Sequence, residues 1–356
     1  MDLKIKSKTF PSNYRYKKNA FINNKQQYNI IYNQSISDSD RFWSETANRI
    51  SWFKKWSNVS NVDFTKAEIS WFEGGKLNAS YNCLDRHVES GHGNQTALIW
   101  EGNNPLDDRS FTYKELLFEV GRFSNVLKSH DIKKGDRVCI YMQMVPELVI
   151  AMLACARIGA IHSIVFGAFS ADSLSNRIND SQCKLLVTQD TGIRGKKNNI
   201  PMKSNCDDAL TKCPTIKTVV VVKRTNVDVK MKHKRDVWWH EEMNKDISDY
   251  CEPEQMDAED PLFILYTSGS TGTPKGVLHS TGGYMVYTSY THQMIFDYQE
   301  NDIYWCTADI GWITGHSYIV YGPLSNRATT VMFEGVPNYP DFGRFWKIVE
   351  KHNINI

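Results

Sequence analysis

Short apolar runs alternate with amphipathic stretches through most of the chain. Residues that favour helix starts precede several of these stretches: Thr112 and Glu115 form a capping box, Pro146 suits a first helical position, and Ser170 suits an N-cap. Strands and helices that alternate in this way form βαβ units with right-handed crossovers. The pattern therefore predicts an α/β fold with mainly parallel sheets flanked by helices. The runs that predict strands are Ala97–Glu101, Arg137–Tyr141, His162–Phe166, Leu185–Thr188, Thr218–Val222, Leu262–Leu265 and Thr330–Phe333.

The first part of the chain has a different pattern. Residues 1–35 are polar, aperiodic and rich in Asn, Lys and Tyr, which predicts a loosely ordered leader. From Ser39 onward apolar residues recur near helical spacing, so we expect one helix with an apolar face that packs into the core. The residues of this face are Phe42, Trp43, Ala47, Ile50, Phe53 and Trp56.

The composition narrows the class of protein. A length of 356 residues suggests about two domains, and a net charge of +2 argues against a protein that acts mainly by binding nucleic acid. No apolar run approaches the length of a membrane span, and the charged N-terminus lacks the apolar core of a secretory signal. The eight cysteines are scattered without zinc-binding spacing, which predicts reduced thiols in a cytoplasmic enzyme and no metal site formed by the protein.

The most informative stretch is Tyr266–Val277, which reads Tyr-Thr-Ser-Gly-Ser-Thr-Gly-Thr-Pro-Lys-Gly-Val. Glycines let a backbone approach an anion, hydroxyls donate to phosphate oxygens, and a lysine adds a compact positive charge. The stretch is not a Walker A loop, because two residues separate Gly272 from Lys275. The alternative is an ordinary Gly/Ser/Thr loop that follows a strand. We predict a phosphate-binding loop formed by Thr267, Ser268, Gly269, Ser270, Thr271, Gly272 and Lys275.

This stretch resembles the phosphate-loop signature of the adenylate-forming, or AMP-binding, superfamily, which includes acyl-CoA synthetases and luciferases. The string from Trp71 to His87 resembles the N-terminal extension of the acetyl-CoA and propionyl-CoA synthetase branch. With the leader at 1–35, the resemblance implies an extension over 36–94 and an incomplete AMP-binding domain over 95–356. The fold that it implies is the front part of the adenylate-forming fold, without the swinging C-terminal domain.

The same resemblance implies roles for two further segments. Arg194, Lys196, Lys197 and Lys203 form a basic run without an acid, which by itself indicates either a solvated loop or an anion patch. In acetyl-CoA synthetases this loop carries an Arg-Gly-Gly-Arg-like string that holds the nucleotide end of coenzyme A. The resemblance thus implies coenzyme A contacts from Arg194, Gly195, Lys196 and Lys197. The two lysines replace a glycine and an arginine of that string, so we expect weaker or altered affinity.

The segment Trp305–Tyr318 resembles the acyl-pocket motif of short-chain acyl-CoA synthetases. The resemblance implies that Ile313 and Thr314 flank the acyl group and that Thr314 also touches coenzyme A. Within the same segment, Asp309 and His316 read as structural residues more than as catalytic ones. The string that begins at Glu334 matches a family turn in which the asparagine, here Asn338, contacts coenzyme A.

The resemblance implies ATP, Mg²⁺ and coenzyme A as cofactors and co-substrates. The activity would be conversion of acetate to acetyl-adenylate and then to acetyl-CoA, with AMP and pyrophosphate released. Family members continue past Ile356 with an adenine loop and a catalytic lysine, so the catalytic residues are unknown here and a missing C-terminal portion is an expected partner. The alternatives are a propionyl-CoA or other short-chain acyl-CoA synthetase, and an inactive fragment that only binds nucleotide or coenzyme A. We expect neither nucleic acid nor membrane as a partner.

Overall fold

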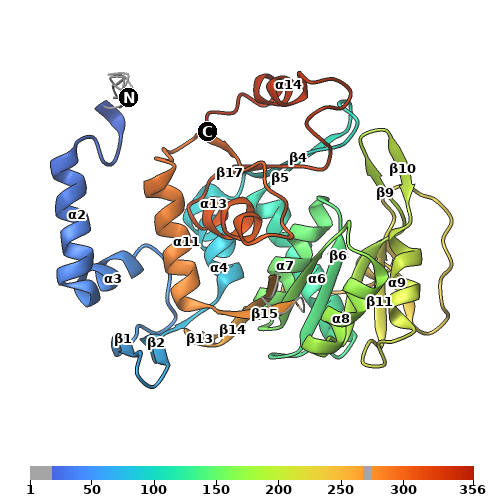
Figure 1. Cartoon of the computed structure of the whole chain (residues 1–356), viewed down its shortest axis with the longest axis horizontal. Coiled ribbons are helices and arrows are strands. Elements are labelled where there is room, and N and C mark those ends of the chain that lie inside the picture. The colour runs from blue at the N-terminus through green and yellow to red at the C-terminus, as the bar shows by residue number, and fades with distance from the viewer. Residues whose placement is uncertain (1–17, 268–273) are drawn as a thin grey trace, which may run out of the picture.

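The computed structural model describes residues 18–267 and 274–356, which form an α/β assembly (Figure 1). Its larger sheet has seven strands in the order β12-β11-β8-β6-β7-β14-β15. All neighbours in this sheet are parallel except β14 and β15, which form an antiparallel pair at one edge. The strands are β6 (Arg137–Met142), β7 (Ile161–Phe166), β8 (Leu185–Gln189), β11 (Thr218–Val222), β12 (Asp236–Trp238), β14 (Pro261–Thr267) and β15 (Lys275–Ser280).

A second sheet has four strands in the order β16-β17-β4-β5, of which only β5 is antiparallel to its neighbour. Its strands are β4 (Thr96–Glu101), β5 (Asp108–Thr112), β16 (Ile303–Trp305) and β17 (Thr329–Phe333). Three small two-stranded pairs complete the strands. They are β1 (Asn58–Asp63) with β2 (Glu68–Glu73), β3 (Lys76–Leu77) with β13 (Met256–Asp257), and β9 (Gly192–Arg194) with β10 (Lys197–Ile200).

Helices cover both faces of the seven-stranded sheet. Alternate residues of β6 point to opposite faces, so Ile140 joins the main core and Tyr141 joins a separate core under α8 and α9. The helices are α2 (Lys25–Ser37), α3 (Ser39–Ala47), α4 (Ala79–Cys83), α5 (Asp85–His87), α6 (Tyr113–Ser129), α7 (Pro146–Arg157), α8 (Ala171–Ser181), α9 (Met202–Leu210), α10 (Trp239–Met243), α11 (Gly282–Ile295), α12 (Ile313–Gly315), α13 (Gly322–Ser325) and α14 (Arg344–Lys351), with π-helical turns at Val88–His92 and His316–Tyr321.

The architecture confirms the predicted α/β class and the mainly parallel sheets. The predicted capping box is present at the start of α6, and Ser170 caps α8 as predicted. Pro146 is the first residue of α7. These signals were reliable because each depends on a few adjacent residues and needs no distant contact.

The predicted continuous apolar helix from Phe42 to Trp56 is wrong. Helix α3 ends at Ala47, and the chain then turns. Distant side chains bind the backbone that a longer helix would use: Asn82 bonds both the N–H and the C=O of Ser51, and Arg86 donates to the C=O of Arg49. Tertiary hydrogen bonds therefore outweigh the helical periodicity of the sequence.

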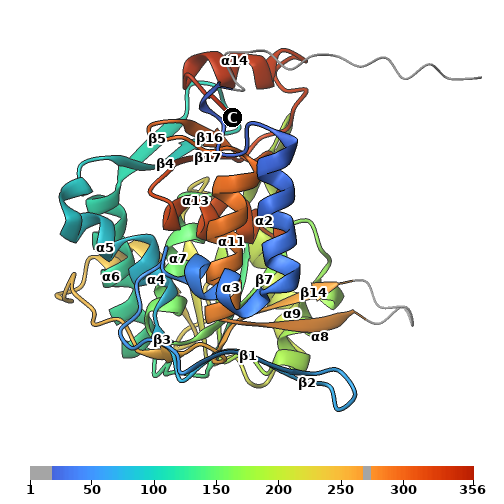
Figure 2. The ribbon, with the colours of Figure 1, turned by 90° about the vertical axis from the view of Figure 1, so that its left-hand side faces the viewer.

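The predicted loose leader also differs from the structure where the chain is described. Residues 25–37 form helix α2, capped by Asn24, although none of its residues is buried. The helix stands at the edge of the molecule, outside α11 (Figures 1 and 2). Residues 1–17 lie outside the described part of the chain.

Candidate functional site

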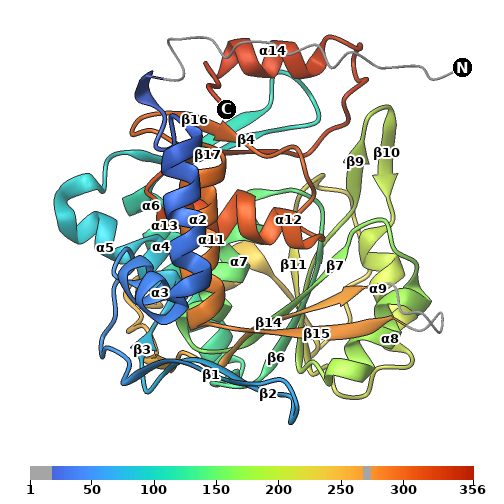
Figure 3. The ribbon, with the colours of Figure 1, turned by 60° about the vertical axis from the view of Figure 1, so that its left-hand side comes forward.

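The predicted coenzyme A loop is the tip of the β9–β10 hairpin, which projects from the sheet beside α9 (Figures 1 and 3). Arg194 pairs with Lys197 across the hairpin, and Gly195 and Lys196 form the turn between them. Gly195 has φ +60°, a left-handed conformation that glycine adopts without strain. Arg194, Lys196 and Lys197 are all exposed, so three cations lie at one tip.

The base of this hairpin is held by a side chain from the neighbouring sheet. The amide oxygen of Gln143 accepts the N–H of Ile193 at 2.9 Å. A Cβ at Gly192 would lie only 2.4 Å from that oxygen, so glycine is required for this approach. Gln143 is fixed in turn because its own N–H donates to Gln189 at 2.8 Å.

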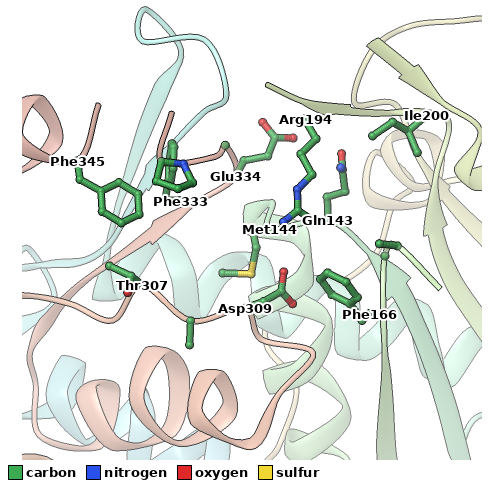
Figure 4. A pocket seen from close by; sticks show the side chains of 15 residues that line it. Gln143, Met144, Phe166, Arg194, Ile200, Thr307, Asp309, Phe333, Glu334 and Phe345 are labelled. Atoms are coloured by element: carbon green, nitrogen blue, oxygen red, sulfur yellow. The ribbon is translucent and has the colours of Figure 1, made fainter. Parts of the chain in front are cut away.

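A cavity of about 170 Å³ opens beneath the hairpin, and the guanidinium of Arg194 points into it (Figure 4). Arg194 also lies over the ring of Phe166, with 5.8 Å from its central carbon to the ring centre. The cavity walls come from the ends of β6 and β7, from residues 307–309 and from the turn after β17. They are Gln143, Met144, Phe166, Gly167, Ala168, Arg194, Ile200, Thr307, Ala308, Asp309, Phe333, Glu334, Gly335, Pro337 and Phe345.

Asp309 is a partly buried acid in the wall of this cavity, which the buried Glu334 also lines. Burial raises the pKa of its carboxyl, whereas the N–H of Gly311 at 2.7 Å and the charge of Arg194 act in the opposite direction. The bond to Gly311 shapes the turn that leads into α12. Asp309 therefore has a structural role here, in agreement with the interpretation of the sequence.

The turn that carries Asn338 meets the hairpin tip. A Cβ at Gly195 would lie 3.0 Å from Val336 and 3.8 Å from Tyr339, so the two segments are in direct contact. Asn338 itself is exposed beside this contact, and Pro337 lines the cavity. The structure thus brings Arg194, Gly195 and the Asn338 turn together, although they are far apart in the sequence.

The predicted acyl residues lie on another surface. Ile313 and Thr314 are exposed on α12, which packs closely because a Cβ at Gly315 would lie 2.3 Å from the carbonyl oxygen of Asp309. Ile313 lines a groove of about 540 Å³ together with Leu278 and Tyr284, and not the cavity of Arg194. Thr314 lines neither space. Ile313 and Thr314 therefore do not line the cavity into which Arg194 points.

The predicted phosphate loop lies between β14 and β15, the antiparallel pair at one edge of the large sheet. Thr267 ends β14, Lys275 begins β15, and these two exposed residues are partners in the antiparallel ladder. The predicted residues Ser268, Gly269, Ser270, Thr271 and Gly272 lie outside the described residues. Tyr266 donates a hydrogen bond to Asp180 at 2.6 Å, and burial together with this bond raises the pKa of Tyr266.

The surroundings of Lys203 and Arg224 were not predicted from the sequence. Lys203 is not part of an anion patch, because it is 1% exposed and its amino group binds Asp207 and Asp236 at 2.8 Å. Arg224, to which the sequence analysis assigns no role, forms a double hydrogen bond with Glu334. The position of Arg224 just after the buried strand β11 was a signal that could have indicated a role at the sheet edge.

His316 packs as expected from the sequence and does not reach solvent. Burial lowers its pKa to about 4, and its Nδ1 contacts the carbonyl oxygen of Trp312 at 3.1 Å. Within the ranges that the structure covers, no cluster of three or more His, Cys, Asp or Glu side chains is suited to a metal ion. Across residues 18–267 and 274–356, no helix combines the length and apolar character needed to cross a bilayer.

Comparison with known proteins agrees with the resemblance. The profile described as AMP-binding enzyme matches residues 84–356, which is most of the chain. The chain belongs to this family of AMP-binding enzymes. The profile described as acetyl-coenzyme A synthetase N-terminus matches residues 28–83, so the N-terminal segment points to one branch of the family.

Several curated relatives carry the name acetyl-coenzyme A synthetase. The one from Magnetococcus marinus is 57% identical, over 98% of this chain and 54% of the relative. The one from Desulfatibacillum aliphaticivorans is 60% identical, over 93% of this chain and 51% of the relative. The chain therefore spans about half the length of these relatives.

Proposed function

We propose that this chain supplies the coenzyme A site and the phosphate loop of an acetate-activating ligase. In the first half-reaction, an acetate oxygen attacks the α-phosphorus of ATP and pyrophosphate leaves. In the second, the coenzyme A thiolate attacks the acyl carbon of acetyl-adenylate and AMP leaves. The observation that carries the proposal is the contact of Gly195 with Val336, which joins two segments that the family resemblance assigns to coenzyme A.

Each group of residues has a part in this proposal. Arg194, Lys196 and Lys197 would bind the phosphates at the nucleotide end of coenzyme A, and Gly195 lets the backbone turn beneath them. Asn338 and Thr314 would contact the same ligand. Ile313 would border the acyl group.

The nucleotide phosphates would lie at the phosphate loop. Thr267 and Lys275 would hold them together with Ser268, Gly269, Ser270, Thr271 and Gly272. Mg²⁺, bound to those phosphates, would neutralise part of their charge. Donors at the phosphate oxygens stabilise the charge that develops during phosphoryl chemistry.

Propionate is the second candidate substrate. Ile313 borders a groove of about 540 Å³, which leaves room for more than a methyl group. One methylene changes transition-state binding by only about 1–3 kcal/mol. We therefore expect activity with both acids and a preference for acetate.

We propose that catalysis also requires residues equivalent to the second half of the relatives, on this or on another polypeptide. Apolar side chains on β15, α11 and the segment at α12 are exposed, as at a surface that another polypeptide covers. Among them Leu278 is 56% exposed, Tyr287 54% and Trp312 55%. Taken alone, the chain would bind coenzyme A without catalysis.

Pyrophosphate exchange tests the proposed function. The chain would be assayed alone and mixed with the second half of the Magnetococcus marinus relative, with acetate or propionate as substrate. We expect exchange only in the mixture and faster exchange with acetate. Faster exchange with propionate would favour the second candidate. A mixture that forms a complex but shows no acid-dependent exchange would contradict ligase activity.

A cytoplasmic location is part of the proposal. All eight cysteines are free, and seven of them are buried, as suits a reducing compartment. Cell fractionation with detection of the tagged chain would test this. Recovery in the membrane or secreted fraction would contradict it.

A further inference from the structure

Asn103 lies beneath the hairpin tip and is only 4% exposed. Its amide oxygen accepts the N–H of Gly195 at 2.6 Å, and its amide nitrogen donates to the C=O of Gly195 at 3.0 Å. A carboxamide is the side chain that offers an acceptor and a donor at this spacing. Asn103 thus fixes the backbone between Arg194 and Lys196.

The same residue is tied to the turn that carries Asn338. The backbone N–H of Asn103 donates to the carboxylate of Glu334 at 3.2 Å. The side chain of Glu334 has no exposed area, and a carboxylate in that setting needs a charged partner. Arg224 provides it through two hydrogen bonds of 2.8 Å and 2.7 Å, and this pairing raises the pKa of Arg224.

Arg224 is itself held in place on both sides. The buried carboxylate of Asp190 accepts the backbone N–H of Arg224 at 3.0 Å and that of Thr225 at 3.1 Å. The guanidinium of Arg224 lies over the ring of Trp100, 5.1 Å from its centre. A continuous set of polar contacts therefore runs from the end of β8 through Arg224, Glu334 and Asn103 to the hairpin tip.

We propose that Asn103 and Arg224 are positioning residues for coenzyme A, an inference that rests on the coenzyme A site proposed above. Asn103 sets the distance between the hairpin cations and the Asn338 turn, so that the two segments can bind the same ligand. Arg224 neutralises Glu334, whose carboxylate would otherwise repel the phosphates of an anionic ligand next to Arg194. In this proposal the hairpin binds the nucleotide end of coenzyme A. Changing Asn103 or Arg224 should therefore weaken binding only of ligands that carry the nucleotide.

The test is calorimetric titration of the full chain with coenzyme A and with pantetheine, which lacks the nucleotide. Asn103→Ala should weaken coenzyme A binding about tenfold, the size expected when a preorganised pair of hydrogen bonds is lost. Pantetheine binding should not change. The matched control is Asn104→Ala, because Asn104 is the neighbouring asparagine and is exposed.

A second variant covers the case in which Asn103→Ala does not fold. Arg224→Lys keeps the positive charge but loses the double hydrogen bond, and should weaken coenzyme A binding severalfold. Thermal unfolding of each variant shows that the fold is retained. Wild-type coenzyme A affinity in the folded variants, or equal losses for coenzyme A and pantetheine, would overturn the positioning role. Absence of coenzyme A binding by the unchanged chain would instead overturn the proposed function and this inference with it.

Discussion

At the hairpin tip, Lys196 and Lys197 keep positive charge but lack the planar guanidinium of the family string. A lysine is a point charge, whereas an arginine binds phosphate through two parallel hydrogen bonds. Because Arg194 and Lys197 face each other across the hairpin, a second arginine at 197 would lie beside the first.

We expect Lys197→Arg to tighten coenzyme A binding by about three- to tenfold, as one improved charge-assisted hydrogen bond would. Calorimetric titration of the full chain would measure this. Lys66→Arg on the β1–β2 hairpin is the matched control, since it makes the same change at an exposed position away from the site. Unchanged or weaker affinity in Lys197→Arg would show that residue 197 does not face the phosphates.

Asp309 gives a pH-dependent prediction. Burial raises the pKa of its carboxyl, so the folded chain binds this proton more tightly than the unfolded chain does. Its contribution to stability is therefore present at low pH and is lost as pH rises through the raised pKa. Asn at this position keeps the acceptor for the N–H of Gly311 but cannot ionise.

Asp309→Asn should raise the midpoint of thermal unfolding at neutral pH by roughly 2–4 °C, equivalent to about 1 kcal/mol in a domain of this size. The difference should vanish near pH 3, below the usual Asp pKa of about 3.9. Asp208→Asn, at an exposed position on α9, should change neither value. A stabilisation that grows on acidification would contradict this explanation.

The surroundings of single residues could be predicted where they depend on adjacent residues, and not where they depend on distant ones. Arg194 and Gly195 lie at the tip that the basic run indicated. Lys203, in the same run, is buried against Asp207, four residues further on, and against the distant Asp236. The carboxylate that binds Arg224 is likewise distant in the sequence. Asn103 gave no signal, because its partner Gly195 is brought close only by the fold.

At the scale of elements, helix α14 shows how a buried charge holds a segment in place. Glu101 at the end of β4 is completely buried and binds Arg344, Lys351 and His352 of α14 and the residue after it at 2.6–2.9 Å. Burial alone would raise the pKa of Glu101, but the hydrogen bonds from His352, Lys351 and Arg344 outweigh it and lower the pKa. The stabilisation is therefore present above the usual Glu pKa and is lost as pH falls through the lowered value.

Glu101→Gln should reduce the free energy of unfolding at neutral pH by about 2 kcal/mol. Breaking a fully buried ion pair costs about 3–5 kcal/mol. We expect a smaller loss here because Lys351, one of the partners of Glu101, is partly exposed. Denaturant unfolding would measure it, and hydrogen exchange should speed up in α14. Glu350→Gln, an exposed change in the same helix, is the control. A Glu101→Gln loss that persists unchanged in acid would contradict the role of the ionised carboxylate.

Helices and strands could be predicted from the sequence where the hydrophobic pattern matches the burial of the element. Strands such as β6 and β8 are buried on both faces, which produces the unbroken apolar runs that predicted them. The hairpin β9–β10 was missed because its strands are short, mostly exposed and polar. The end of α3 was missed because Asn82 and Arg86, which replace its hydrogen bonds, lie on later helices.

At the scale of the whole molecule, the predicted site residues Arg194 and Ile313 border two different spaces. The cavity of Arg194 lies between the two sheets, whereas Ile313 faces the groove beside β15 and α11. The relatives are about twice as long as the matched region. The predicted division at residues 35 and 94 stays a prediction.

The central claim is that the β9–β10 hairpin and the Asn338 turn together hold coenzyme A. Calorimetric titration of coenzyme A into the full chain and into its Arg194→Ala variant tests it most directly. We predict saturable binding at one site and an affinity about tenfold lower in the variant, the loss expected for a charged hydrogen-bond donor aimed at a phosphate. Absence of binding, or equal affinity in the two proteins, would contradict it.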